Sequence, residues 1–443
     1  MNKRPLAMLP ALVCVLSLHA PPARAQFSQQ GPKKVGSGAV NFAGSGVYQG
    51  GSTAISADGN TAIEGGYDDN IGTGASWVWT RTAGVWNQQG LKLVDEDSPV
   101  AFQGSAVALS ADGNTAVIGG YTDGFGAGAA WIWRRNGAVW SQLGNKLVGS
   151  GATGLALQGY SVAISADGNT AIVGGTFDNN QVGAAWIWKR NGSLWTQQGP
   201  KLVGSNSLGK AEQGWSVALS ADGNTALVGG YSDDTAVGAV WVWTRSPTGV
   251  WSQQGPKLVG TGATGIAAQG SGVALSADGN SAVIGGYSDH AGVGAVWFWT
   301  RSGGVWSQVG NKLVATGAIG ESEQGAVVSL SSDGRTLLVG GPGDNLGAGA
   351  AWVWKRSGNV FTQFGAKLVG SGAAGLATQG RSAALSGDGR TAIVGGLSDN
   401  TNDGAAWFFA SSAVDPGGCA PGGRQCIVPG PSRTPETGGD RTP

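Results

Sequence analysis

The stretch Ser110-Ala111-Asp112-Gly113-Asn114-Thr115-Ala116 decides the fold, because it or a close relative occurs seven times in the 443-residue chain. A fixed period indicates one supersecondary unit copied in series. The repeat predicts the architecture, but it restricts function only to a class, because copied positions mostly serve the scaffold. The copies follow one another at nearly equal intervals, with their aspartates at Asp58, Asp112, Asp167, Asp222, Asp278, Asp333 and Asp388.

The start of the chain, residues 1–25, has the organisation of a secretory signal. Lys3 and Arg4 give a charged start, residues 6–18 are mostly apolar, and Ala23-Arg24-Ala25 forms a small-x-small cleavage site before Gln26. No other stretch is apolar for long enough to span a membrane. We therefore expect an exported protein, periplasmic or extracellular, from which residues 1–25 are removed.

The composition argues against several classes of partner. Removing the signal takes away three of the 27 basic residues and no acid, which leaves 24 against 27 acidic residues and a net charge of −3. Nucleic-acid binding normally requires a basic patch, so we expect no nucleic-acid partner. The 82 glycines follow no Gly-x-y period, as collagen would require, but sit at fixed places in each repeat.

Two cysteines, Cys419 and Cys426, follow the signal, and both lie near the end of the chain. In an oxidising compartment they could close a small loop, so we predict a structural disulfide, with a reactive thiol as the alternative. The surrounding segment, residues 413–443, is rich in proline, glycine and charge, which is typical of a disordered tail.

The repeat reads as four antiparallel strands. In the copy at residues 103–158, a short run at 105–110 is followed by Asp112-Gly113, a strong hairpin signal. Residues 115–120 return as a second strand, 121–128 form a loop, and 129–134 form a third strand. A further hairpin turn at Asn136-Gly137 leads to a fourth strand over 139–148. Each unit should therefore form one small twisted sheet.

The third strand shows how the sheets pack. Trp131 and Trp133 alternate onto one face, while Ala130 and Ile132 occupy the other, so both faces are apolar and should be covered. Seven such sheets covered on both sides predict a radial stack, the β-propeller, with the tryptophans between blades rather than stacked on a ligand. The pair recurs as Trp77/Trp79, Trp186/Trp188, Trp241/Trp243, Trp297/Trp299, Trp352/Trp354 and Trp407/Phe409.

The two ends of the repeat region predict that the ring is closed. The last unit stops after its third strand, at residues 405–410, whereas residues 27–33 have the sequence of a fourth strand, as in Trp195-Thr196-Gln197-Gln198-Gly199-Pro200-Lys201. The N-terminal strand should therefore complete the seventh sheet and leave no exposed edge. We predict an all-β, closed seven-bladed propeller over residues 26–412.

The unit resembles the FG-GAP repeat, the blade of the integrin α-subunit head and of bacterial secreted proteins, over residues 26–410. The family's Phe-Gly pair is similar to a Gln-Gly pair that begins each copy, and its third strand looks like Gly238-Ala239-Val240-Trp241-Val242. The resemblance implies that loops on one face meet the ligand. The glutamines, which we expect to be structural, are Gln49, Gln103, Gln158, Gln213, Gln269, Gln324 and Gln379.

The family's calcium sites do not carry over to this sequence. They require several oxygens between the first two strands, and here that loop is a tight turn such as Ala221-Asp222-Gly223-Asn224. We therefore predict no calcium there and a structural role for the turn aspartates. A second aspartate, eleven residues after each of these, is also expected to be structural; these are Asp69, Asp123, Asp178, Asp233, Asp289, Asp344 and Asp399.

Positions that differ between copies are the better site candidates. The residue after Gln-Gly and the residue after the Gly-Gly pair of the second strand both vary, and both should reach the ligand face. An exposed set of this kind suits sugar stacking or peptide capture, although free variation of loops is the alternative. The candidate ligand-binding residues are Trp215, Tyr160, Tyr231, Tyr121, Tyr287 and Arg381.

The remaining polar residues give weaker signals. An acidic run, Asp95-Glu96-Asp97, together with Asp68 and Asp69, could hold a cation, although such runs are usually solvated. We expect no cofactor and no catalysis, since the mature chain has a single histidine, His290, and no recognisable acid–base or metal set.

The sequence thus predicts a monomeric, non-catalytic binding or adhesion module with a protein or carbohydrate partner outside the cell. A carbohydrate-binding lectin and a polysaccharide-cleaving enzyme are the alternatives. The latter would need two carboxyl groups about 5 to 9 Å apart.

Overall fold

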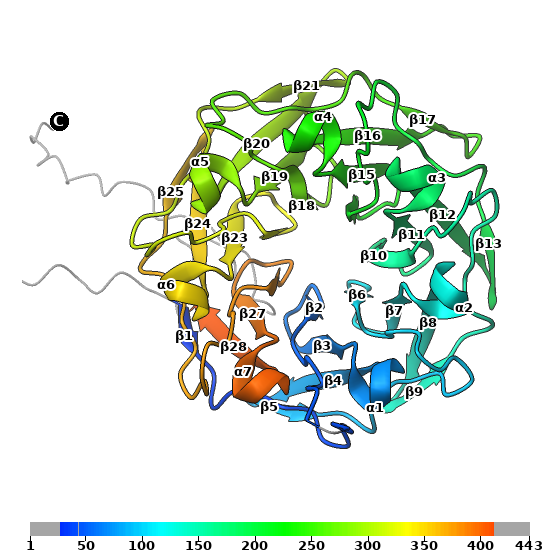
Figure 1. Cartoon of the computed structure of the whole chain (residues 1–443), viewed down its shortest axis with the longest axis vertical. Helices are drawn as coiled ribbons and strands as arrows, with labels where there is room; N and C mark the ends of the chain where they lie inside the picture. The colour runs from blue at the N-terminus through cyan, green and yellow to red at the C-terminus, as the bar shows by residue number, and fades with distance from the viewer. Residues whose placement is uncertain (1–26, 43, 412–443) are drawn as a thin grey trace, which may run out of the picture.

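Seven four-stranded antiparallel sheets form a closed ring in the computed structural model, which describes residues 27–42 and 44–411 (Figure 1). Each sheet, numbered here as blades one to seven in chain order, runs from an inner strand beside the central axis to an outer strand at the rim. The predicted all-β, seven-bladed propeller is therefore confirmed. The predicted signal at residues 1–25, the cysteine pair Cys419 and Cys426 and the tail lie outside the described residues.

The strands of each blade follow one another in chain order, from the inside outward. The inner strands are β2 (Ser52–Ile55), β6 (Ala106–Leu109), β10 (Gln158–Ile164), β14 (Ser216–Leu219), β18 (Gln269–Leu275), β22 (Val327–Leu330) and β26 (Ser382–Leu385). The second strands are β3 (Thr61–Gly66), β7 (Thr115–Gly120), β11 (Thr170–Gly175), β15 (Thr225–Gly230), β19 (Ser281–Gly286), β23 (Thr336–Gly341) and β27 (Thr391–Gly396).

The outer half of each blade is built in the same way. The third strands are β4 (Ala75–Thr82), β8 (Ala129–Asn136), β12 (Ala184–Asn191), β16 (Ala239–Arg245), β20 (Ala295–Ser302), β24 (Ala350–Ser357) and β28 (Ala405–Ser411). The outer strands are β5 (Val85–Gln88), β9 (Val139–Gln142), β13 (Leu194–Gln197), β17 (Trp251–Gln253), β21 (Val305–Gln308), β25 (Val360–Gln363) and β1 (Phe27–Gln29).

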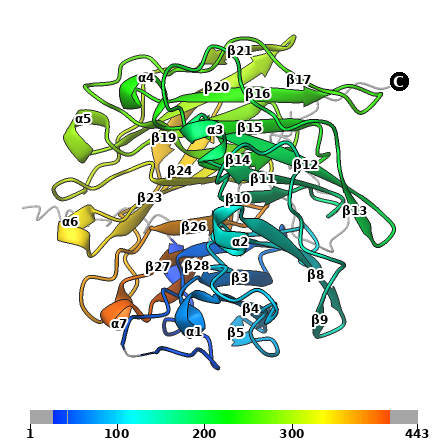
Figure 2. The same cartoon turned by 45° about the vertical axis from the view of Figure 1, so that its right-hand side comes forward.

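A four-residue helical turn joins the second and third strands of each blade, and all seven turns lie on one face of the ring (Figures 1 and 2). The two middle residues of each turn have positive φ, as at Asn179 (50°) and Asn180 (57°). This conformation is unusual for residues other than glycine. The turns are α1 (Asp69–Gly72), α2 (Asp123–Gly126), α3 (Asp178–Gln181), α4 (Asp233–Ala236), α5 (Asp289–Gly292), α6 (Asp344–Gly347) and α7 (Asp399–Asn402).

Neighbouring blades pack tryptophan against aliphatic faces, as predicted. Trp131 and Trp133 of blade two pack on Ile63 and Val78 of blade one. The first tryptophan of each pair is fully buried, and the same interface recurs between the other blades. The inter-blade loops pass very close to these indoles: a Cβ on Gly149 would lie 2.1 Å from Cδ1 of Trp186. Glycine at this position therefore lets the inter-blade loop cross the edge of the indole.

The N-terminal strand completes blade seven, as the split repeat predicted. β1 pairs antiparallel with β28, Phe27 opposite Ser411 and Gln29 opposite Phe409. The pairing continues beyond the strand, because Lys34 exchanges two backbone hydrogen bonds with Ala406 at 2.7 and 3.0 Å. The side chain of Phe27 is buried in the core of blades six and seven. The ring is thus closed by strand pairing between the two ends of the chain.

The fourth strand is shorter than predicted. In blade two it ends at Gln142, although the N–H of Leu143 still donates to the carbonyl of Ile132 at 2.7 Å. The chain pairs with the sheet again at Leu147, which bridges to Ala130. The intervening residues turn away from the strand, because the side chain of Gln142 donates to the carbonyl of Gly144 at 3.2 Å and closes a tight turn. The third strand is instead longer than predicted and reaches Asn136.

Candidate functional site

The turns between first and second strands are held by local hydrogen bonds to the repeated aspartate. Asp112 Oδ1 accepts the backbone N–H of Asn114 at 3.0 Å and the hydroxyl of Ser110, whose own oxygen accepts the N–H of Thr115 at 2.9 Å. Partial burial favours a higher pKa for Asp112, but these hydrogen bonds outweigh it and hold the pKa below its usual value. The predicted structural role is confirmed, and freedom from calcium stays a prediction.

The second repeated aspartate anchors three segments on the face with the helical turns. Asp178, which begins α3, is buried; its Oδ1 accepts the N–H of Thr153 at 2.7 Å, and its Oδ2 pairs with Lys201. It therefore ties the helical turn to the inter-blade loop and to the chain beyond the outer strand, which confirms the structural interpretation. Equivalent ion pairs join Lys33 to Asp399, Lys92 to Asp69, Lys146 to Asp123, Lys257 to Asp233, Lys312 to Asp289 and Lys367 to Asp344.

The repeated glutamine is likewise part of the scaffold, as expected. Gln158 is buried, accepts the N–H of Gly149 at 2.6 Å and donates to the carbonyl of the same residue at 3.0 Å. Its backbone bridges in parallel to Gly128. The side chain of Gln158 thus pairs with the N–H and the carbonyl of Gly149 as a neighbouring strand would. These buried backbone groups of the inter-blade loop are thereby hydrogen-bonded.

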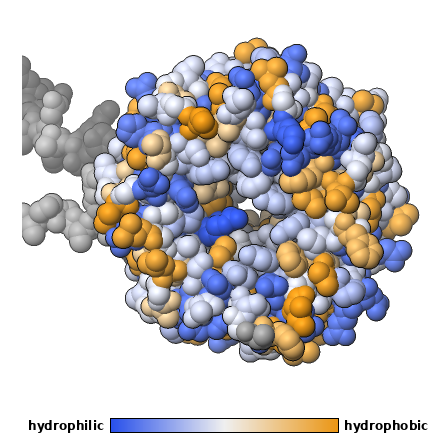
Figure 3. All heavy atoms as spheres, viewed as in Figure 1, coloured by the Kyte–Doolittle hydropathy of each residue, from blue (hydrophilic) through white to orange (hydrophobic). Residues whose placement is uncertain are grey.

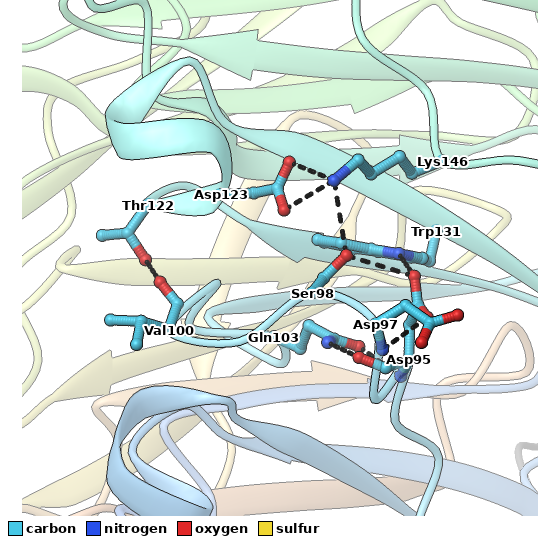
Figure 4. Close-up of polar contacts among 9 residues, drawn as sticks. All are labelled: Asp95, Asp97, Ser98, Val100, Gln103, Thr122, Asp123, Trp131 and Lys146. Atoms are coloured by element: carbon cyan, nitrogen blue, oxygen red, sulfur yellow. Dashed lines mark hydrogen bonds and ion pairs between the residues drawn. The ribbon is translucent and has the colours of Figure 1, made fainter.

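The carboxylate of Asp95 accepts a hydrogen bond that a backbone carbonyl accepts in another blade. Its Oδ2 accepts the indole N–H of Trp131 at 2.6 Å and the hydroxyl of Ser98 at 3.3 Å (Figure 4). In blade three the corresponding indole, that of Trp186, donates to the backbone carbonyl of Ser150 at 2.9 Å. The loop before blade two is one residue shorter than the one before blade three. The carboxylate of Asp95 therefore takes over a contact that the shorter backbone does not make.

The other weak metal candidates do not form a group of three or more acidic side chains that could hold a metal ion in the described part of the chain. Asp69 pairs with Lys92 and accepts the N–H of Val40 at 2.6 Å. Asp68 is half-buried, and burial raises its pKa. Within the described residues, no group of three or more histidines, cysteines, aspartates or glutamates is placed to hold a metal ion. Of the remaining two candidates, Glu96 lines a hollow together with Asp69 and Lys92, whereas Asp97 is not among the residues that line it.

A cavity of about 520 Å³ lies on the axis of the ring and is walled by the inner strands of all seven blades. Figure 3 shows its opening at the centre of the face with the helical turns, bordered by side chains of mixed hydropathy. The residues at this end of the cavity are those that the sequence marked as variable between copies: Gly51, Tyr67, Ser105, Tyr121, Tyr160, Trp215, Ser271, Ala326, Arg381 and Leu397.

Aromatic rings form a continuous arc around the mouth of this cavity. Trp215 lies within the arc between two tyrosines, with its ring centroid 4.7 Å from that of Tyr160 and 4.3 Å from that of Tyr231. Successive rings are 4.3 to 6.5 Å apart, and all are partly exposed. The aromatic arc runs through blades one to five as Tyr48, Tyr67, Phe102, Tyr121, Tyr160, Trp215, Tyr231 and Tyr287.

Burial raises the pKa of four tyrosines of the aromatic arc, Tyr67, Tyr121, Tyr160 and Tyr231, so these four keep their hydroxyl protons at neutral pH. Burial raises the pKa of Tyr67 to about 12, and the neighbouring Tyr48 contributes to this rise. Burial also raises the pKa of Tyr231 to about 12, together with the nearby carboxylate of Glu212, to which the Tyr231 hydroxyl donates. The arc therefore offers apolar ring faces together with hydroxyl groups that can donate and accept hydrogen bonds.

The structure brings all the predicted ligand-binding residues to this one mouth. Trp215, Tyr160, Tyr121 and Arg381 line the cavity, while Tyr231 and Tyr287 continue the aromatic arc beside it.

Sequence reasoning missed Tyr48 and Phe102. Both directly precede a Gln-Gly pair, and both have positive φ, 61° and 55°. The position before the Gln-Gly pair also varies between copies. Comparing the copies at this position, as well as at the position after the pair, could have found both residues.

Comparisons with known proteins do not assign this chain to a family. No family model matches the sequence, and no curated protein matches it. In the described part of the chain, no helix is both long and apolar enough to cross a membrane.

Proposed function

We propose that this protein is a non-catalytic binding module whose ligand docks at the mouth of the central cavity. The observation that carries the proposal is the aromatic arc: eight partly exposed rings in mutual contact around a cavity of about 520 Å³. Cavities of this size with apolar walls and a few polar groups are the usual form of small-ligand sites.

The pattern of repetition supports this location. Residues that build the blades, such as Asp112 and Gln158, have counterparts in every copy and are engaged in local hydrogen bonds. At the cavity mouth, by contrast, the position occupied by Trp215 holds Tyr160 in blade three and Arg381 in blade seven. A position that tolerates such different residues is not required for the blade itself, which leaves it free to serve recognition.

Within this class, a carbohydrate ligand is favoured by the chemistry of the arc. Sugar rings present apolar C–H faces flanked by hydroxyls, and the arc presents ring faces beside protonated tyrosine hydroxyls. A protein ligand and polysaccharide cleavage remain competing proposals. Release of products from candidate polysaccharides tests the last of these.

The proposal also includes export of the chain through residues 1–25 and kinship with FG-GAP propellers. Support for both comes from the sequence alone: the charged, apolar and small-x-small order of residues 1–25, and the Gln-Gly and Gly-x-Val-Trp-Val layout of the repeats. Cell fractionation with and without residues 1–25 tests the export.

A ligand screen with matched variants tests the site. The chain from residue 26 is applied to a glycan array and, in parallel, used to capture proteins, beside a variant carrying Trp215→Ala and Tyr160→Ala. The control is Arg335→Ala, which alters a separate hollow that Asp333 and Arg356 also line. We expect the double variant to lose binding and the control to keep it; the reverse result would move the site to the other hollow.

A further inference from the structure

One positively charged side chain, that of Arg381, lines the central cavity. Of the described residues that line it, only Arg381 is charged. The side chain of Arg381 is exposed, and it makes no hydrogen bond or ion pair within the described part of the chain. Its charge acts on nearby Glu323, but the guanidinium makes no hydrogen bond within the described residues, so its donors at the cavity mouth are available to a ligand.

The arginines of the blades behave differently. Arg135 donates to Asn114 at 2.9 Å and to Gln89 at 3.2 Å, and its guanidinium lies 5.6 Å from the ring centroid of Trp140. Arg245 and Arg301 repeat this arrangement in blades four and five. These arginines are part of the scaffold, and Arg381 is not in an equivalent position.

Arg381 shares its opening with the aromatic arc. It stands at the same repeat position as Trp215 and Tyr160, directly after a Gln-Gly pair. Burial raises the pKa of Tyr121, and the positive charge of Arg381 opposes this rise. Arg381 has the same opposing effect on Tyr160, so its charge reaches rings that belong to blades two and three. A ligand resting on the arc would therefore come within reach of the guanidinium.

We propose that the ligand is a polysaccharide containing uronic acid, whose sugar rings pack on the aromatic arc while a carboxylate pairs with Arg381. This inference rests on the proposed function and specifies its ligand class. A uronate residue combines an apolar pyranose face with an anion, which are the two features that this mouth can recognise. A guanidinium can hold a carboxylate through two parallel hydrogen bonds, which adds orientation as well as affinity.

Two neighbouring features bear on the binding of an anionic sugar. The cavity of about 520 Å³ is large enough for a short chain end, being in the range of pockets that enclose drug-sized molecules. Glu323 lies near Arg381 on the rim, where burial raises its pKa and Arg381 lowers it, but Glu323 does not line the cavity. Arg381 is thus the only charged residue on the cavity wall among the described residues, while Glu212 and Asp68 lie close enough to the aromatic arc to add to the rise that burial causes in the pKa of Tyr231 and of Tyr121.

The test compares acidic oligosaccharides with their own methyl esters. Oligomers of galacturonate, glucuronate and mannuronate, each paired with its fully esterified form, are titrated into the chain from residue 26 by calorimetry. The variants are Arg381→Gln, Arg381→Lys and Trp215→Ala, with Arg390→Gln as the control, because Arg390 lies in the turn between β26 and β27 of the same blade.

We expect at least one acidic oligomer to bind 10- to 100-fold more tightly than its ester, the range for a hydrogen bond to a charged group. Arg381→Gln should reduce the acid to the affinity of the ester, Arg381→Lys should restore part of the difference, and Arg390→Gln should change nothing. The acid's advantage should also shrink with added salt, because the pair is exposed.

Equal binding of acid and ester, no binding of any acid, or an Arg381→Gln variant that still distinguishes acid from ester would overturn the uronate proposal. These outcomes differ from failure of the proposed function. If Trp215→Ala removes binding of acid and ester alike while Arg381→Gln removes neither, the site stands and the ligand class is wrong. If Trp215→Ala leaves all binding intact, the site itself is wrong.

Discussion

Two rings of residues surround the axis on the same face of this propeller, and the seven copies agree in one and disagree in the other. The outer ring consists of the buried aspartates and their lysine partners, with the same pair in every blade, as in Asp178 and Lys201. The inner ring, at the cavity mouth, holds tryptophan, tyrosine, arginine, serine, alanine or glycine at a single repeat position. The blades must have the same structure to close a ring, so the residues that build them are repeated. Side chains at the open axis are not needed for closure and can differ. Variation between copies therefore marks the surface that is free to bind a ligand.

The largest effect should come from removing the strand that closes the scaffold. Deleting residues 26–35 takes away the β1–β28 pairing, the buried Phe27 and the ion pair of Lys33 with Asp399. We expect the melting temperature to fall by more than about 10 °C, since each 1 kcal/mol shifts it by about 2 °C in a large domain and several are lost. Calorimetry of the deletion beside Ser28→Ala, an exposed change in the same strand, checks this, and an unchanged melting temperature would falsify the closure.

Replacing an aspartate of the outer ring should lower stability almost as much. Asp178→Ala removes the acceptor for Thr153 and leaves Lys201 without its carboxylate. Breaking a buried pair by removing one partner costs about 3–5 kcal/mol, and we expect the lower half of that range because Lys201 is partly exposed. Denaturant unfolding measures the loss. A cost below about 0.5 kcal/mol, as for an ordinary surface substitution, would show that the repeated pair is not a scaffold element.

At one core position the residue type differs from that of the other copies, and we expect this residue to make the free energy of unfolding depend on pH. Glu64 is fully buried beside Trp79, whose indole N–H it accepts at 2.9 Å, where other copies carry aliphatic residues such as Ile118 and Val173. Burial raises the pKa of Glu64 from 4.5 to about 8. The folded protein then holds a proton that the unfolded chain releases, so the free energy of unfolding should fall as pH rises from 4.5 to about 8.

The size of this effect is on the order of 5 kcal/mol, from about 1.4 kcal/mol per unit of pKa shift. Glu64→Val, which restores the residue type of blade three, should remove the fall and raise stability most at pH 8. Urea unfolding at several pH values gives the comparison. A wild-type curve parallel to that of Glu64→Val across this range would contradict the assignment.

The smallest effect on stability is expected at the inner ring. Trp215 is partly exposed and packs on Tyr160 and Tyr231, so Trp215→Ala should cost about 1 kcal/mol or less, the worth of its aromatic contacts. Trp241→Ala, the matched change at a fully buried tryptophan in the same blade, should cost about 3–5 kcal/mol. Similar costs for the two tryptophans would mean that Trp215 belongs to the core.

Much of the fold could be predicted because it depends on short-range signals that recur. Asp112-Gly113 marks a hairpin wherever it occurs, and the alternation at Trp131 and Trp133 shows that both faces of the sheet are covered. The split unit at the chain ends was sufficient to predict closure. The end of the fourth strand was missed, although the contact that closes the turn, from the side chain of Gln142 to the carbonyl of Gly144, recurs in every blade. The period marks these residues as scaffold, but it does not show that the glutamine side chain closes a turn.

The site could be predicted only in part, for a related reason. Comparing copies identified Trp215, Tyr160 and Arg381 as residues that depart from the repeat, but contacts between them depend on how seven blades meet at the axis. The ring contacts of Tyr48 with Tyr67 and of Phe102 with Tyr121 form only where the blades are assembled around the axis. The acidic run at Asp95 suggested a binding role in the sequence, whereas in the structure the carboxylate of Asp95 accepts the indole N–H of Trp131.

The most direct measurement is a crystal structure of the protein bound to a ligand selected by the glycan array. We expect density for sugar rings at the cavity mouth, packed against Trp215 and Tyr160, with the scaffold pairs such as Asp178 and Lys201 unmoved. A ligand seated instead in the hollow lined by Asp333, Arg335 and Arg356 would contradict the idea that variation between copies marks the binding surface.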